Sequence, residues 1–222
     1  MYIKLKNIIK KNTKPINVFF VGIGGVSMYS LAIYLMQIGH KIIGSDLQNS
    51  DNVIKLKKIG ISVFNKHSSE NIVNVDALIF NSATENSVEV LEAKKLNIPI
   101  FSRAELLGEI LKTYKTPICV AGAHGKTTTT ALIYSILEQA QKNPSLHLGG
   151  NLVENGKSYN YNNGEEIICE ACEYKDSFLY FTPKISVILN IVPEHLDYFK
   201  NFGNIVKSFK QFASNSHIVI CE

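Results

Sequence analysis

The stretch Ala121-Gly-Ala-His-Gly-Lys-Thr-Thr-Thr-Thr130 decides how the chain is interpreted. An apolar run, Pro117–Ala121, precedes it and predicts a buried strand, and apolar residues at helical spacing follow it over Thr127–Ala140. The predicted order is therefore strand, glycine turn, helix. Glycines allow a tight turn that aims backbone N–H groups at an anion, and the helix N-terminus adds partial positive charge. The stretch predicts a phosphate-binding loop.

Two side chains of this loop suit a nucleotide phosphate that carries a metal ion. Lys126 would supply a full positive charge, and Thr127 would supply a hydroxyl to a phosphate-bound Mg²⁺. The loop is two residues shorter than the general G-x-x-x-x-G-K-[ST] pattern, so an ordinary glycine turn with an incidental lysine stays open. Consecutive threonines are poor helix formers, and their place at a helix start favours the phosphate-binding interpretation.

A second glycine turn lies near the N-terminus. Asn17–Val21 predicts a strand, Gly22-Ile-Gly-Gly-Val-Ser-Met28 turns it into a helix, and a further strand, Lys41–Ser45, ends at Asp46. This βαβ layout is typical of sites that place a diphosphate on a helix N-terminus and a ribose hydroxyl on a carboxylate. Ser27 stands where the third glycine of G-x-G-x-x-G would fall. The pattern therefore specifies no particular nucleotide, and a glycine turn without a ligand stays open.

Strand and helix patterns alternate through both halves of the chain. We expect further strands at 61–64, 75–80, 98–101, 166–169, 185–189 and 217–221, and helices at 53–59, 88–96 and 103–111. Such alternation predicts an α/β fold: a Rossmann-like parallel-sheet domain over residues 1–114, followed by a phosphate-loop α/β domain over residues 115–222. The polar linker Lys112–Pro117 would separate the two domains.

Ligands of a parallel α/β sheet gather at the carboxyl ends of its strands. In the first domain this edge would carry glycine, hydroxyl and charged groups: Gly22, Ser45, Asp46, Ser82 and Arg103. Arg103 fits equally well as a surface residue at a helix start. In the second domain Glu170 follows one strand, and Asn190 and His195 follow the next. A carboxylate and an imidazole beside a phosphate loop are where a nucleotide-bound Mg²⁺ would find ligands.

Composition and charge exclude several classes of protein. The chain has 222 residues, 45% of them hydrophobic, which is enough for two packed cores. The net charge of +4 is mild, and a nucleic-acid partner would need a denser basic face. The apolar runs are short, so we expect a cytoplasmic location and no membrane partner. Cys169 and Cys172 form a C-x-x-C without a second ligand pair for zinc, which favours reduced, structural thiols.

These motifs together resemble the Mur ligase family of peptidoglycan synthesis, and the resemblance covers essentially the whole chain. It rests on the two glycine turns, on Gly-Ser-Asp46, and on Glu170-Ala-Cys-Glu-Tyr-Lys-Asp-Ser-Phe-Leu179 and Asn190-Ile-Val-Pro-Glu-His-Leu-Asp-Tyr198. The short loop G-x-H-G-K-T-T-T is a trait of that family. Two departures stand out: Cys172-Glu-Tyr174 replaces the more usual Asp-Glu-Ser, and Glu194 replaces a common Asp.

The resemblance implies ATP-dependent ligation of L-alanine to UDP-N-acetylmuramate, with ATP and Mg²⁺ as cofactors. The γ-phosphate of ATP would pass to the lactyl carboxylate, and the alanine amine would attack the resulting acyl phosphate. By position, the UDP-sugar would contact Gly22, Gly24, Gly25, Ser45, Asp46, Ser82 and Arg103. The ATP phosphates would contact Gly122, Ala123, His124, Gly125, Lys126, Thr127 and Thr128. Magnesium would be held by Thr127, Glu170 and His195, and catalysis would depend on Lys126, Asn190 and His195.

Members of this family continue through the rest of the ATPase domain and through a domain that binds the amino acid. We therefore expect the second domain to be incomplete, the chain alone to have low or no ligase activity, and a separate chain to be one source of the missing part.

Three alternatives stay open. A murein peptide recycling ligase typically opens its first turn with a cysteine, and Gly22-Ile-Gly-Gly25 argues against it. The others are a non-catalytic UDP-sugar or nucleotide-binding module and a nicotinamide-dependent dehydrogenase. A dehydrogenase function would give no role to Lys126, Glu170 and His195.

Overall fold

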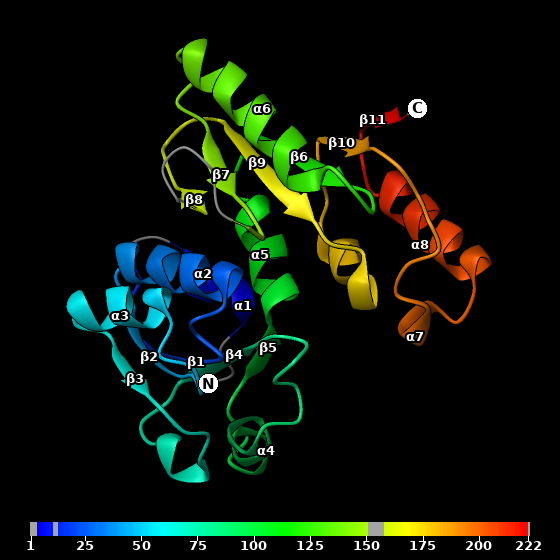
Figure 1. Cartoon of the computed structure of the whole chain (residues 1–222). Coiled ribbons are helices and arrows are strands. Elements are labelled where there is room, and N and C mark those ends of the chain that lie inside the picture. The colour runs from blue at the N-terminus through cyan, green and yellow to red at the C-terminus, as the bar shows by residue number, and fades with distance from the viewer. Residues whose placement is uncertain (1–3, 11–12, 151–157, 222) are drawn as a thin grey trace. The chain divides into compact units, whose positions relative to one another are not determined.

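The computed structural model describes residues 4–10, 13–150 and 158–221. The chain divides into two compact units, Met1–Leu106 and Leu107–Glu222. Each unit contains a sheet with helices packed against it (Figure 1), which confirms the expected α/β fold. None of the described helices combines the length and the hydropathy that a bilayer crossing requires.

The first unit contains a parallel sheet of five strands in the order β3-β2-β1-β4-β5. Its strands are β1 (Asn17–Val21), β2 (Lys41–Ser45), β3 (Ser62–Phe64), β4 (Ala77–Phe80) and β5 (Ile100–Ser102). Its helices are α1 (Leu5–Ile8), α2 (Val26–Gln37), α3 (Asp51–Lys58), η1 (Ser69–Asn71, a 3₁₀ turn), α4 (Val88–Lys95) and α5 (Arg103–Leu111), which continues into the second unit. The chain builds outward from β1 to β3 and then crosses to β4, so the strand order reverses beside β1. Ligands of doubly wound sheets bind at this reversal.

Burial explains why β1 is central. Val18, Phe19, Phe20 and Val21 are all 0% exposed, as expected for a parallel strand that is covered on both faces. Helices α3 and α4 begin with serine caps: Ser50 Oγ accepts the Val53 N–H at the start of α3, and Ser87 Oγ accepts the Val90 N–H at the start of α4. The glycine turn at residues 22–25 therefore leaves the carboxyl edge of the sheet directly from a buried strand.

The second unit contains a sheet of six strands in the order β11-β10-β6-β9-β7-β8. Its strands are β6 (Thr116–Ala121), β7 (Ser145–His147), β8 (Tyr159–Asn160), β9 (Glu166–Ala171), β10 (Ile185–Ile188) and β11 (Ile218–Cys221). Its helices are α6 (Lys126–Gln139), η2 (Tyr174–Tyr180, a 3₁₀ segment), α7 (Leu196–Phe199) and α8 (Phe202–Ser214). The sheet is mixed, because β8 pairs antiparallel with β7 while the other described pairs are parallel.

Several features of the second unit differ from the sequence interpretation, among them strand β7 and the short helical segments η2 and α7, which were not anticipated. Strand β9 continues to Ala171, which pairs with Ala121, so Glu170 lies within the strand and not beyond its end. Helix α8 was not anticipated, although its buried residues Ile205, Phe209 and Phe212 repeat at helical spacing. The rings of Phe178 and Phe212 stack at 4.6 Å, which fixes α8 against η2.

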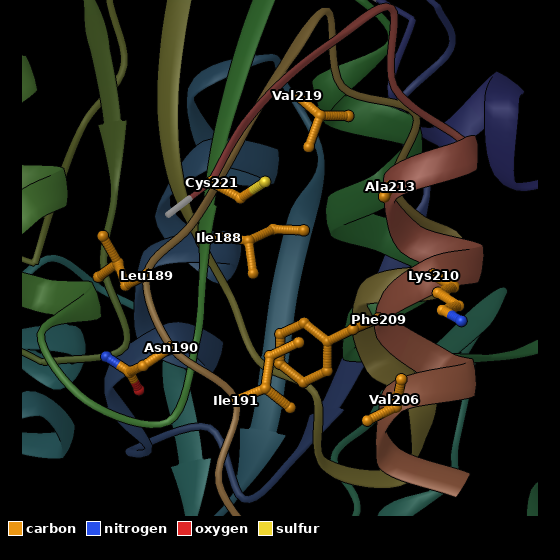
Figure 2. A pocket seen from close by; sticks show the side chains of 10 residues that line it. All are labelled: Ile188, Leu189, Asn190, Ile191, Val206, Phe209, Lys210, Ala213, Val219 and Cys221. Carbon is orange, nitrogen blue, oxygen red and sulfur yellow. The ribbon is translucent and has the colours of Figure 1, made fainter. Parts of the chain in front are cut away.

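An apolar groove of about 410 Å³ lies between β10, α8 and the edge strand β11 (Figure 2). Ile188, Phe209 and Val219 are among its apolar lining, and Asn190 and Lys210 add polar groups. All residues of β11 are exposed. Cys119, Cys169, Cys172 and Cys221 form no disulfide bond, and Cys119 and Cys169 are paired in register on β6 and β9.

Candidate functional site

The phosphate-binding loop joins β6 to α6, and its glycines have conformations that other residues avoid. Gly122 has φ 138° and Gly125 has φ 83°. A Cβ on Gly122 would lie 3.1 Å from both the backbone N and the backbone O of Asn190. Helix α6 begins at Lys126, immediately after this turn. The loop therefore passes close to the chain that follows β10, and only glycine fits that approach.

Asn190 holds this loop through both its backbone and its side chain. Its carbonyl accepts the Ala123 N–H at 3.2 Å, and its Oδ1 accepts the His124 N–H at 2.9 Å. Its Nδ2 donates to the His124 carbonyl at 3.0 Å. The contact follows from the sheet, since β10 pairs with β6 up to Ala121. Asn190 thus sets the conformation of the loop residues 122–124.

Lys126 folds back over its own loop. Its Nζ donates to the carbonyl oxygens of Gly122 and Ala123, the latter at 3.2 Å. The same ammonium lies 3.3 Å from Oε2 of Glu173, whose side chain is only 4% exposed. A charge that loses water must be compensated by hydrogen bonds and an opposite charge, and Lys126 has both. Sequence analysis assigned Glu173 no role, because it lies 47 residues away from its partner.

Thr127 and Glu170 lie on either side of a glycine pair. The Gly149 N–H donates to Glu170 Oε2 at 2.7 Å, and a Cβ on Gly150 would lie 3.8 Å from Thr127 Oγ1. The other carboxylate oxygen, Glu170 Oε1, is buried and has no hydrogen-bond partner among the described residues. A buried carboxylate oxygen without a partner is costly in free energy, and a hard divalent cation would compensate it. This oxygen and the Thr127 hydroxyl fit a magnesium ion.

His195 lies beside Glu173. One ligand atom each from Glu173, Glu194 and His195 falls within 4.8 Å of the others. His195 Nε2 is 3.9 Å from Glu173 Oε1, and His124 Nε2 is 3.6 Å from Glu194 Oε1. The structure therefore gathers charged groups from three segments around the loop. Glu170 does not belong to this particular group, and Thr128 is exposed in the first turn of α6.

In the first unit, side chains of the chain itself form hydrogen bonds with the backbone of the glycine turn. The Gly24 N–H donates to Asp46 Oδ2 at 2.8 Å, and the Gln48 N–H donates to Asp46 Oδ1 at 2.9 Å. Asn52 Nδ2 donates to the Gly24 carbonyl at 3.0 Å. A Cβ on Gly24 would lie 2.7 Å from Val53 Cγ2, so the site requires glycine. Both oxygens of Asp46 are engaged by backbone N–H groups, and Asp46 therefore acts on the shape of the turn.

The remaining predicted residues of the first unit lie around this turn. Gly22 has φ 73°, and Gly25 is the N-cap of α2 with an ordinary φ of −60°. Arg103 Nη1 donates to Ser27 Oγ at 3.3 Å, which places its positive charge at the first turn of α2. Ser82 is exposed just after β4.

Ser45 belongs to a buried polar cluster that sequence analysis missed. Its Oγ lies 3.1 Å from His67 Nδ1, and that nitrogen lies 3.0 Å from Glu89 Oε1. Asn71 Nδ2 also donates to Glu89 Oε1, at 3.2 Å. Glu89 is 0% exposed although its neighbours in α4 gave it no distinguishing pattern. The only signal in the sequence was that Glu89 is an acidic residue in the first turn of a predicted helix.

Comparison with known proteins places both units in one family. The profile of the Mur ligase family catalytic domain matches residues 17–115, and the profile of the Mur ligase middle domain matches residues 120–221. The UDP-N-acetylmuramate–L-alanine ligase of Caldanaerobacter subterraneus subsp. tengcongensis is 45% identical over 210 residues, which are 92% of this chain and 46% of that relative.

Solved structures of ligases have the same fold as this chain. The UDP-N-acetylmuramate-alanine ligase of Thermotoga maritima superposes with a TM-score of 0.84 at 28% identity, over 92% of this chain and 48% of that one. The UDP-N-acetylmuramate:L-alanyl-γ-D-glutamyl-meso-diaminopimelate ligase of Neisseria meningitides has the same fold, with a TM-score of 0.85 at 24% identity over 94% of this chain and 72% of that one. The chain spans about half the length of the curated relatives it matches. Because the two profiles follow one another over nearly all of its length, the chain belongs to the Mur ligase family.

Proposed function

We propose that this chain carries the UDP-sugar site and the ATP site of a UDP-N-acetylmuramate:L-alanine ligase, with residues 1–114 and 115–222 as its two functional domains. The observation that carries the proposal is the phosphate loop, with Lys126 at the start of α6 and a Glu170 oxygen that no described residue bonds. The names of relatives that are 45% identical support the choice of substrate. Because the chain spans about half of their length, the complete reaction is proposed for a whole ligase of that kind.

In the ATP site, the chain's own groups would bind and orient the phosphates. The N–H groups at the start of α6 would donate to an anion, and the helix dipole favours negative charge there. Lys126 would leave the carbonyls of Gly122 and Ala123 and donate to the nucleotide, with Glu173 as its buried counter-ion. Asn190 would keep the loop in register while this exchange takes place.

Thr127, Glu170 and His195 would hold Mg²⁺. The ion would supply charge neutralisation at the γ-phosphate during transfer. The fit rests on the donor set, which is a hydroxyl, a carboxylate oxygen without a described partner and an imidazole. Glu173 and Glu194 would hold His195 and His124 near the loop through the contacts described above.

In the UDP-sugar site, the turn after β1 and the Arg103 guanidinium would bind the diphosphate. Asp46 is committed to the N–H groups of Gly24 and Gln48, so its first task there would be to hold the turn. In the ligation, the lactyl carboxylate would accept the γ-phosphate, and the amine of L-alanine would displace phosphate from the acyl phosphate. Such a reaction needs mainly positioning and charge stabilisation from the protein.

Titration calorimetry of the purified chain tests the proposal. We expect Mg-ATP and UDP-N-acetylmuramate each to bind saturably. Lys126→Ala should weaken ATP binding by about 30-fold, the value of a charge-assisted hydrogen-bonding group, and leave the sugar nucleotide unaffected. Lys115→Ala is the matched control, because it removes a lysine of the same unit whose side chain is 73% exposed.

Two outcomes would contradict the proposal. Equal loss of both ligands in Lys126→Ala would refute the assignment of the two sites to separate domains. A folded chain that binds neither ligand would refute the function itself.

A further inference from the structure

The loops that follow β9 and β10 contain an unusual backbone. Lys175 and Asp176 have φ of 53° and 56°, and His195 and Lys200 have φ of 55° and 68°. Non-glycine residues avoid this left-handed region, and each costs on the order of 1 kcal/mol or more unless the surroundings impose it. Four such residues on two adjacent loops therefore require contacts that hold them.

Asp176 links these segments to one another. Its Oδ2 accepts the Tyr198 hydroxyl at 2.7 Å, and its Oδ1 accepts the hydroxyl of Ser208. Its own N–H donates to the Glu173 carbonyl at 2.9 Å. Tyr198 belongs to α7 and Ser208 to α8, so one carboxylate joins η2 to both helices. We call Asp176, Tyr198 and Ser208 the Asp176 cluster.

The cluster is connected to His195 through Tyr174. The Tyr174 ring lies 4.8 Å from the His195 ring, centroid to centroid, and 6.3 Å from the Tyr198 ring. Tyr174 also donates its hydroxyl to Asp197 Oδ2 at 3.3 Å. The His195 carbonyl accepts the N–H groups of Tyr198 and Phe199, each at 3.0 Å. The position of α7 thus decides where the imidazole lies.

Helix α7 cannot fix this position alone. It has only four residues, Leu196–Phe199, and a helix of that length has no stability of its own. Its place relative to η2 is set by the Tyr198 hydrogen bond to Asp176, by the longer Tyr174–Asp197 hydrogen bond and by the packing of Phe199, which is 4% exposed. Tyr198 itself is 38% exposed. It therefore orients α7 mainly through the hydrogen bond of its hydroxyl, and less through the burial of its ring.

We infer that the Asp176 cluster positions His195: it holds α7 against η2, so that the imidazole presents Nε2 beside Glu173 and the phosphate loop. The inference rests on the proposed function in one respect, that His195 faces a nucleotide-bound metal ion. Asp176, Tyr198 and Ser208 are positioning residues, because both Asp176 oxygens are already engaged by hydroxyls. Groups that orient a metal-binding histidine typically change metal affinity by about 10- to 100-fold when they are removed.

The protonation state of Tyr198 agrees with its role as a hydrogen-bond donor to Asp176. Its hydrogen bond to Asp176, together with partial burial and the Asp176 charge, raises the pKa of Tyr198 to about 12. The phenol therefore keeps its proton, and its donor capacity, throughout the range in which the protein would work.

The first test follows the His195 ring by NMR in the full chain without any ligand. The ring signals are assigned by comparison with His195→Gln, and the Tyr174 ring current should displace them from free-histidine positions. In Tyr198→Phe we expect at least half of that displacement to be lost. Tyr134→Phe is the matched control, because it removes another tyrosine–carboxylate hydrogen bond of 2.7 Å, to Glu138, on α6. Unchanged His195 signals in Tyr198→Phe would overturn the inference.

The second test measures metal binding. Mn²⁺ affinity in the presence of ATP is followed by electron paramagnetic resonance, and ATP affinity is measured with the metal removed. We expect Tyr198→Phe and Ser208→Ala to weaken Mn²⁺ binding about tenfold and to change metal-free ATP binding less than twofold. Equal loss of both affinities would mean that the cluster only supports the fold, and it would overturn the inference.

The two tests separate this inference from the proposed function. If His195 shifts in Tyr198→Phe while the wild-type chain binds no ATP, the positioning role stands and the nucleotide function fails. If the wild-type chain binds Mg-ATP and the His195 signals do not move, the positioning role fails alone.

Discussion

The two glycine turns of this chain share the strand–glycine–helix arrangement, but different side chains hold them. In the first unit, Asp46 accepts the Gly24 N–H, and a carboxylate thus already holds the turn that precedes α2. In the second unit, an amide, Asn190, holds the loop, and the nearby carboxylate Glu170 keeps one oxygen without a described partner. A strand–glycine–helix pattern therefore predicts a turn. The groups that satisfy its N–H donors decide what kind of ligand it can take.

The caps of the two helices differ in the same way. Gly25 begins α2 with φ −60°, whereas Gly125 begins α6 with φ 83°. Only the second conformation requires glycine. The pattern alone does not distinguish the two glycines, although one is replaceable and the other is not.

The largest expected effect is that of Asp46→Ala. The change leaves the N–H groups of Gly24 and Gln48 without their acceptor, so we expect the free energy of unfolding of the first unit to fall by about 2 kcal/mol. Because the chain contains no tryptophan, hydrogen exchange of peptides from each unit is the appropriate measurement. Asp51→Ala, at the start of α3, is the control. An unchanged exchange rate around Gly24 would remove the contrast between the turns.

An intermediate effect should separate the two cap glycines. Gly125→Ala forces a left-handed alanine and should destabilise the second unit by about 1 to 2 kcal/mol. Gly25→Ala should stay within about 0.5 kcal/mol, since its Cβ would meet no atom closer than 3.5 Å. Urea unfolding of both variants checks this. Similar losses in the two variants would show that the backbone difference has no energetic consequence.

The smallest expected effect is a loss of folding stability at alkaline pH, and it is confined to the second unit. The pKa of Tyr198 is raised to about 12 in the folded chain, from about 10 for an unfolded tyrosine. A raised pKa means that the stabilisation is complete below pH 10 and is lost as the pH rises toward 12. The stability difference between wild type and Tyr198→Phe should therefore be constant up to about pH 10 and shrink above it.

Absorbance of tyrosinate measures the same ionisation directly. One late-titrating tyrosine should disappear in Tyr198→Phe, and Tyr180→Phe, which removes a tyrosine that is 49% exposed, should leave it in place. Burial also raises the pKa of Tyr114 and of Tyr134, so their late titration should remain in Tyr198→Phe. The same number of late-titrating tyrosines in wild type and Tyr198→Phe would contradict the assignment.

Local signals made most of the fold predictable. Asn17–Val21 and Lys41–Ser45 form strands with the expected bounds, because apolar runs that end at glycine or serine are short-range features. The strand β9 continued two residues beyond its apolar run because Ala171 pairs with β6, a contact that no local pattern encodes. Helix α8 was missed although its apolar spacing was visible in the sequence.

The site was predictable only where a motif carries its own chemistry. The positions of Lys126 and Gly125 at the start of a helix follow from the loop sequence, and the roles assigned to the motif residues stay predictions. The pairing of Lys126 with Glu173 and the contact of Ser45 with His67 join segments far apart in the chain. The Asp176 cluster depends further on left-handed backbone at residues that are not glycine, which sequence gives no reason to expect.

The folded-back position of Lys126 has a consequence for selectivity. An incoming anion must replace two carbonyl contacts and share the ammonium group with the buried Glu173 carboxylate. An isolated phosphate ion offers few oxygens for that exchange, whereas a triphosphate also gains contacts with the N–H groups along the loop. If the loop binds a nucleotide as proposed, the folded-back position of Lys126 would favour polyphosphates over small anions.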